Sequence, residues 1–179
     1  KRAVLRVMLL LPLGGPDGAL RACLPQVLRR GTAKLPDLRA IGEALDELYG
    51  ARIESIVRKE GESLCIGFLS DCIDEAYAPD ADRLAAKVIR LLADLLCDPY
   101  LQDGVFCPDY TAGEREGLID RIAAQKNDPH SWAPKRLTEL MCENEPYGQP
   151  ALGTIEQARK ITENKLYTAY RRALDEAQI

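Results

Sequence analysis

Few side chains in this sequence could carry out metal or nucleophilic chemistry. The 179 residues include one histidine, His130, and six cysteines, at positions 23, 65, 72, 97, 107 and 142. A zinc site needs three or four suitably spaced ligands, and no pair of these residues has ligand spacing on a helix. A Cys–His nucleophile would need a cysteine beside His130, and nothing in the sequence places one there. We expect His130, which follows Asp128-Pro129, to lie exposed at a helix start.

The cysteines lie mostly inside apolar stretches such as Leu64-Cys65-Ile66 and Leu95-Leu96-Cys97. No C-x-x-C pair occurs, and a chain of this length can bury a core without covalent bridges. We therefore expect buried thiols in a reducing, cytoplasmic compartment. A disulfide framework in an oxidising compartment is the alternative.

The composition is that of a globular protein, with 46% hydrophobic and 29% charged residues and a formal charge of −4. Acidic and basic residues are intermixed, which argues against a nucleic-acid-binding surface because such surfaces concentrate Lys and Arg. The longest apolar run, residues 7–13, contains Pro12 and is far shorter than the roughly 20 residues that span a bilayer. It resembles the core of a signal peptide, but no small-x-small cleavage pattern follows, so we interpret it as a strand. We expect no nucleic-acid partner and no membrane insertion.

Strand signals come first in the chain and helix signals follow. Residues 3–11 are almost continuously apolar, and residues 51–58 and 64–70 flank the turn Lys59-Glu60-Gly61-Glu62, which predicts an antiparallel hairpin. One hairpin face is mostly apolar and the other is mixed, with Ile56 among charged residues. The order predicts an α+β domain, an antiparallel sheet with helices packed on one face.

Periodicity and capping signals predict the helices. Residues 19–30 form a helix that Pro25 kinks or shortens, residues 37–49 form a second that Asp37 caps, and residues 80–97 form a third with a leucine-rich stripe. Thr111 with Glu114 makes a capping box for the next helix. That role accounts for Glu114; the alternative is that Glu114 and Glu116 are carboxylates left from a metal site. Further helix starts are predicted at Asp128-Pro129, at Thr154 with its capping partner Gln157, and at Thr162.

Five short motifs occur in an order and spacing that resemble the amino-terminal domain of the pitrilysin/insulinase peptidases, the inverzincins. The resemblance covers nearly the whole chain, and the five motifs together are more specific than any one of them. They are Arg30-Gly31-Thr32 with Leu48-Tyr49-Gly50-Ala51, Asp98-Pro99, Glu114-Arg115-Glu116, Glu145-Pro146-Tyr147-Gly148 before Gly153, and Ile161-Thr162 with Leu166-Tyr167.

Active members of that family carry H-x-x-E-H a few residues before the Gly-Thr pair. Two histidines one helical turn apart bind zinc, and the glutamate activates the metal-bound water. Counted back from Gly31-Thr32, these positions fall on Ala22, Pro25 and Gln26. Alanine has no donor atom, proline is no base and glutamine is a poor zinc ligand. The third ligand, a glutamate on a later helix, falls near Asp120 or Arg121.

The resemblance therefore implies a chain with no catalytic residue, no metal and no cofactor of its own. It also implies that residues 1–179 are one domain, truncated at the C-terminal end, of a longer protein. The implied function is that of a non-catalytic subunit that pairs with an active zinc-peptidase homologue and helps enclose peptide substrates. The fragment itself is expected to self-associate through its unpaired sheet edge. The alternatives are an active peptidase whose zinc site lies outside this chain and a stand-alone interaction domain.

Overall fold

A three-stranded antiparallel sheet organises the chain. The computed structural model describes residues 1–78 and 83–177. The sheet has the order β1-β3-β2 and contains β1 (Arg2–Pro12), β2 (Arg52–Glu60) and β3 (Ser63–Ile73). β3 is central and pairs with β1 from Leu64 opposite Leu11 to Cys72 opposite Ala3. The predicted strand and the predicted hairpin are both confirmed.

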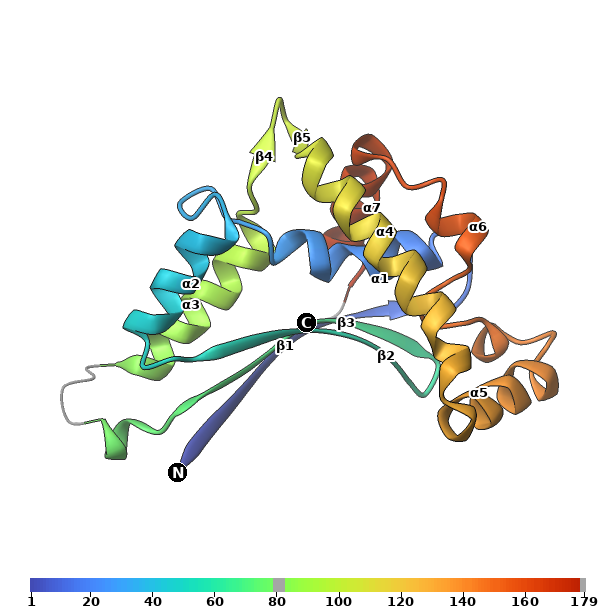
Figure 1. Ribbon diagram of the computed structural model, residues 1–179, viewed down its shortest axis with the longest axis horizontal. Coiled ribbons are helices and arrows are strands. Elements are labelled where there is room, and N and C mark those ends of the chain that lie inside the picture. Colours follow the sequence, from blue (N-terminus) through green and yellow to red (C-terminus); the bar gives the residue numbers. More distant parts are fainter. Residues whose placement is uncertain (79–82, 178–179) are drawn as a thin grey trace.

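The helices cover one face of this sheet (Figure 1). Strand side chains alternate between the faces, so Leu9, Ile53 and Phe68 are buried under the helices. On the opposite face Val4 is 56% exposed, and no helix of the described residues lies against that face in the view of Figure 1. The α+β class is confirmed, with helices packed on one side of an antiparallel sheet.

Seven α-helices, three short 3-10 helices and one small ribbon complete the described chain. Residues 79–82 lie outside the described residues, so the predicted start of the third helix near residue 80 does too. None of the described helices has the length and apolarity to cross a bilayer. The helices and the ribbon are α1 (Gly18–Leu28), α2 (Leu38–Glu47), η1 (Glu75–Tyr77), α3 (Leu84–Cys97), β4 (Leu101–Gln102), β5 (Val105–Phe106), α4 (Pro108–Ala124), η2 (Gln125–Asn127), α5 (Pro129–Met141), η3 (Pro146–Gly148), α6 (Ile155–Ala158) and α7 (Glu163–Glu176).

Most predicted helix caps are present, because each depends only on neighbouring residues. The Asp37 carboxylate accepts a 2.8 Å hydrogen bond from the Ala40 N–H, and Thr154 with Gln157 forms a reciprocal capping box. Asp128 caps α5 by accepting from the His130 N–H. Hydrogen bonds to Ser131, the largest contribution, and to His130 lower the pKa of the Asp128 carboxyl.

The predicted capping box of Thr111 and Glu114 is wrong. α4 begins three residues earlier, at Pro108, whose fixed φ and missing N–H suit a first helical turn. Thr111 is therefore inside the helix, where it is 2% exposed, and its Oγ1 atom has no partner among the described residues. Glu114 is consequently free to make a tertiary contact.

Candidate functional site

The residues at the motif positions lie on α1, which passes through the middle of the helical layer. Ala22 and Cys23 are 0% exposed, Pro25 is buried and Gln26 is half-buried. Pro25 was predicted to kink or shorten this helix. The helix continues past Pro25 to Leu28, and the Pro25 carbonyl accepts a hydrogen bond from the Arg29 N–H. The helix holds these positions in a packed core.

The Gly31-Thr32 pair ends α1 in a tight turn that explains both residue types. A Cβ on Gly31 would lie 2.6 Å from the Pro36 carbonyl oxygen, so only glycine fits. Thr32 is 1% exposed, and its Oγ1 accepts a 3.0 Å hydrogen bond from the Leu35 N–H. The pair fixes the register by which Ala22, Pro25 and Gln26 are assigned to the motif positions.

Few metal-ligating side chains surround these positions. Within the described residues, no group of three or more His, Cys, Asp or Glu could hold a metal ion. His130 is exposed at the start of α5, on a different helix from the motif positions. The prediction of buried thiols holds for Cys23, Cys65, Cys72 and Cys107, but Cys142 is only partly buried and Cys97, the last residue of α3, is exposed.

Helix α4 packs against α1 and carries the position of the third ligand. Asp120 is exposed, and Arg121 is half-buried with its Nη2 atom buried and unpartnered among the described residues. Burial, together with Glu114, raises the pKa of the Cys23 thiol to about 12, while Arg121 and Arg115 oppose this rise. The region beside the motif helix thus contains a guanidinium, which repels a metal cation.

Glu114 has a structural role that the sequence did not indicate. Its carboxylate accepts a 2.7 Å hydrogen bond from Arg30 Nε, and this ion pair joins the end of α1 to α4. Arg29 and Arg30, at the end of α1, are both half-buried. Arg29 donates 3.1 Å to the Ile53 carbonyl, so both arginines are held by partners distant in sequence.

Strand β2 lies beside α1 and forms one edge of the sheet. Besides the contact of Arg29 with Ile53, Ser55 Oγ donates 3.0 Å to the Pro25 carbonyl. Glu60 pairs with Ser63 across a two-residue turn, which makes that pair the closing hydrogen-bonded pair of the hairpin. Backbone direction alternates along a strand, so Ile53, Ser55, Val57 and Lys59 direct their N–H and C=O groups away from β3.

The far end of this edge borders a groove of about 430 Å³. We name it the β2–α5 groove, because Val57, Arg58 and Lys59 form one wall and α5 forms another. Figure 1 shows the tip of the β2–β3 hairpin beside α5. Lys59 Nζ donates 2.6 Å to the Tyr147 carbonyl and lies 4.7 Å from the centre of its ring, which ties the strand to η3.

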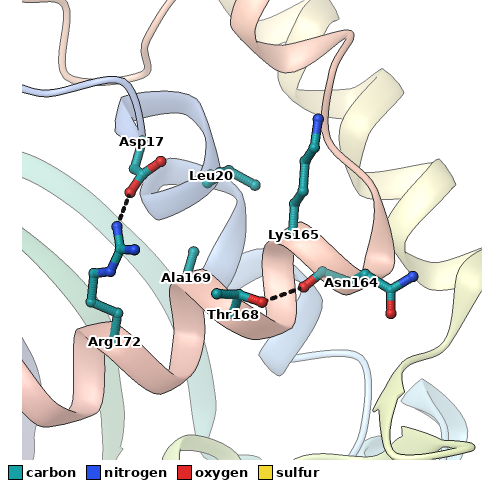
Figure 2. Close-up of a pocket in the computed structure, with 7 residues that line it drawn as sticks. All are labelled: Asp17, Leu20, Asn164, Lys165, Thr168, Ala169 and Arg172. Atoms are coloured by element: carbon teal, nitrogen blue, oxygen red, sulfur yellow. Dashed lines mark hydrogen bonds and ion pairs between the residues drawn. The ribbon is translucent and has the colours of Figure 1, made fainter.

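A second, polar pocket of about 300 Å³ lies between α1 and α7. Figure 2 shows that Asp17 and Arg172 form an ion pair of 2.8 Å across one end, so these two charges neutralise each other. Thr168 Oγ1 donates to the Asn164 carbonyl within α7. Neither Ala22, Pro25 nor Gln26 lines this pocket, so it is separate from the motif positions.

Sequence reasoning missed the β2–α5 groove. It predicted a hairpin with one mixed face, but it gave no sign that Lys59 would contact Tyr147, 88 residues further along the chain. The sequence offered one signal for the edge beside this groove, the two-residue hairpin turn. The turn fixes the strand register and therefore which backbone groups of β2 face away from β3.

Comparison with known proteins adds to this geometry. No protein-family model matches the chain. It is 35% identical over 171 residues to a Bacillus subtilis protein named "Probable inactive metalloprotease YmfF"; the match covers 96% of this chain and 40% of that protein. The chain thus spans well under half the length of its curated relative.

Solved structures show the same fold. A conserved protein from Enterococcus faecalis superimposes with a TM-score of 0.89 at 22% identity, over 99% of this chain and 42% of that one. A peptidase M16 inactive domain from Pseudomonas fluorescens superimposes with a TM-score of 0.65 at 20% identity, over 93% and 37%. The fold is that of the M16, or pitrilysin-like, peptidase domains. The chain thus has the fold of the pitrilysin-like domains, and the similar Bacillus subtilis protein is named as a probable inactive metalloprotease.

Proposed function

We propose that the protein containing this chain is a non-catalytic subunit that pairs with a zinc-bearing homologue and helps enclose its peptide substrate. One observation carries the proposal: Ala22 and Pro25 are buried at the predicted motif positions of α1, while β2 beside it has outward-facing backbone groups with no partner strand among the described residues. The predicted motif positions of this helix offer no zinc ligand, whereas the adjacent β2 edge could hold an extended peptide.

Strand addition is the physical basis of the enclosing role. A sheet edge recruits an extended segment through main-chain hydrogen bonds, and the outward-facing groups of Val57 and Lys59 are available for this. Arg29 and Ser55 join the β2 edge to α1, so a peptide on the edge would lie next to the motif helix. The edge can thus present a peptide without cutting it.

Co-expression of the full-length protein with a homologue that retains H-x-x-E-H tests the pairing. We expect a stoichiometric complex by light scattering, with a permanent interface of roughly 2,000 Å² or more. The complex should cleave an unfolded peptide faster than the homologue alone. A full-length protein that stays monomeric beside the homologue at micromolar concentration would contradict the proposal and favour a stand-alone interaction domain.

The second candidate is a peptidase whose zinc site lies outside this chain. It is favoured by the length of the curated relative, of which this chain spans 40%. Elemental analysis of the dialysed full-length protein separates the two. We expect no stoichiometric zinc and no effect of a chelator; about one tightly bound zinc per chain with chelator-sensitive cleavage would establish the second candidate.

We further propose a cytoplasmic location and self-association of the isolated 179-residue fragment. The first follows from buried thiols such as Cys23 and Cys72, and the second from the free β2 edge. Six titratable thiols in the unfolded, non-reduced protein and dimers in light scattering are the expected results. A mass lower by about two daltons per cysteine pair, reversed by reductant, would indicate disulfides and an oxidising compartment.

A further inference from the structure

The β2–α5 groove has a charge opposite to that of the chain as a whole. Lys59 and Lys135 line it, and among the described lining residues the one carboxylate is Glu139. Arg58 also borders the groove, but its side chain lies on the opposite face of the sheet, because side chains alternate along β2. Glu139 is already paired with Arg136 at 2.9 Å. The chain carries a formal charge of −4, so this local excess of positive charge is a property of the groove. Low-dielectric walls strengthen such a field.

Lys59 retains hydrogen-bond donors toward the groove. The hydrogen bond from Lys59 to the Tyr147 carbonyl leaves other N–H groups of its ammonium free. Burial lowers the pKa of the Lys59 ammonium because it removes water, and an approaching carboxylate would restore the lost solvation.

Backbone and apolar groups lie beside these cations. The free N–H and C=O groups of Val57 and Lys59 can pair with an extended chain, as the alternation along β2 requires. Alternate side chains of an added strand point the same way, so one in two would face the groove. Pro134, Tyr147 and Leu152 contribute apolar wall that suits the methylene groups of a bound side chain.

We propose that the β2–α5 groove recognises an acidic side chain of an extended peptide, so that the substrate class of this subunit is peptides with a carboxylate in the segment paired with β2. The proposal rests on the proposed function, because it assumes that the edge holds a peptide. Main-chain pairing supplies sequence-independent binding, and the groove supplies the selection.

Three dye-labelled synthetic peptides test this preference with the full-length protein. They share an alternating Thr/Val sequence and carry a central Glu, Gln or Lys. By fluorescence anisotropy we expect the Glu peptide to bind about tenfold tighter than the Gln peptide, and the Lys peptide to bind weakest. The preference should shrink at high salt, which screens exposed charges.

Two substitutions and a matched control locate the effect. Lys135→Gln and Lys59→Gln should each reduce the Glu-over-Gln preference at least threefold, roughly as expected for one charge-assisted bond. Lys87→Gln makes the same charge change on an exposed residue of α3 and should leave the preference unchanged. Circular dichroism melting checks that each variant is folded.

Equal binding of the Glu and Gln peptides, or no binding of either, would overturn the inference, as would the same loss of preference in Lys87→Gln. These failures are separate from failure of the proposed function. A complex with the zinc-bearing homologue but no Glu preference refutes only the acidic specificity. A Glu preference without such a complex refutes only the pairing.

Discussion

The motif helix α1 and the β2 edge lie side by side and have opposite properties. α1 is closely packed and largely inaccessible to solvent around the motif positions. Ala22 and Cys23 are 0% exposed, and the Arg30–Glu114 ion pair fixes the end of α1 to α4. The β2 edge has no partner strand among the described residues, and a groove lined by Lys59 and Lys135 lies at its far end. The helix that carries the predicted motif positions is thus closely packed, while the adjacent strand has backbone groups that face away from the sheet.

Introducing the zinc motif into α1 tests most directly whether α1 is as closely packed as this comparison states. The triple change Ala22→His, Pro25→Glu and Gln26→His should lower the free energy of unfolding by about 4 kcal/mol or more, because it overpacks a core and buries polar groups. We also expect no stoichiometric zinc and no turnover, measured by urea unfolding, elemental analysis and peptide cleavage.

Gln26→His alone is the control for that experiment. Gln26 is half-buried, so a single histidine there should be tolerated. A stable triple variant that binds one zinc per chain would show that α1 is not closely packed and would refute the contrast with β2.

Two proline substitutions test which backbone N–H groups of β2 face away from β3. The Val57 N–H faces away from β3, so Val57→Pro should cost less than about 1 kcal/mol of stability yet weaken binding of every peptide. Ile56 is paired with Gly67, and Ile56→Pro removes a ladder hydrogen bond at a cost of about 3 kcal/mol. Urea unfolding compares the two variants, and an equal loss of stability would mean that the backbone assignment along β2 is wrong.

The stability of the closely packed region around α1 should fall in alkaline solution. The Cys23 pKa is about 12 in the folded protein and 9.0 as its ordinary value, so the folded state holds the proton more tightly. This contribution is complete below pH 9 and is lost as the pH rises toward 12, by up to about 1.4 kcal/mol per pH unit. Burial also raises the pKa of Tyr170 to about 12, which adds a decline above pH 10.

Urea unfolding between pH 8 and 10.5 measures that decline. Cys23→Ala should make it shallower between pH 9 and 10, whereas Cys97→Ala, at an exposed position, should not. The same slope in all three proteins would show that Cys23 does not titrate as its burial requires.

The smallest expected effect concerns the ion pair that joins α1 to α4. A double-mutant cycle of Arg30→Met and Glu114→Gln should give a coupling of about 1 kcal/mol, since the two side chains are 32% and 16% exposed. The exposed pair Arg39–Glu43, at 87% and 66%, is the control and should give less than about 0.5 kcal/mol. Equal coupling in both cycles would mean that the Arg30–Glu114 pair contributes little to fixing α1 to α4.

The sequence by itself determined the elements whose signals are local. Strand alternation, the hairpin turn and the caps at Asp37, Thr154 and Thr162 depend on residues at most a few positions apart, so they were predicted correctly. The assignment of Ala22, Pro25 and Gln26 to the motif positions is also local, because it is counted from Gly31-Thr32, and it stays a prediction. The error at Thr111 arose from a competing local signal, Pro108, which starts α4 earlier.

Only the tertiary structure decided what those residues do. Glu114 pairs with Arg30 across 84 positions, and Lys59 reaches Tyr147 across 88. No pattern in a single sequence encodes such contacts, because they depend on how helices dock on the sheet. The same docking buries Ala22 and leaves the far end of β2 beside a groove. The sequence therefore predicts which ligands are missing from the motif helix, and folding determines which backbone groups of the neighbouring strand face outward among the described residues.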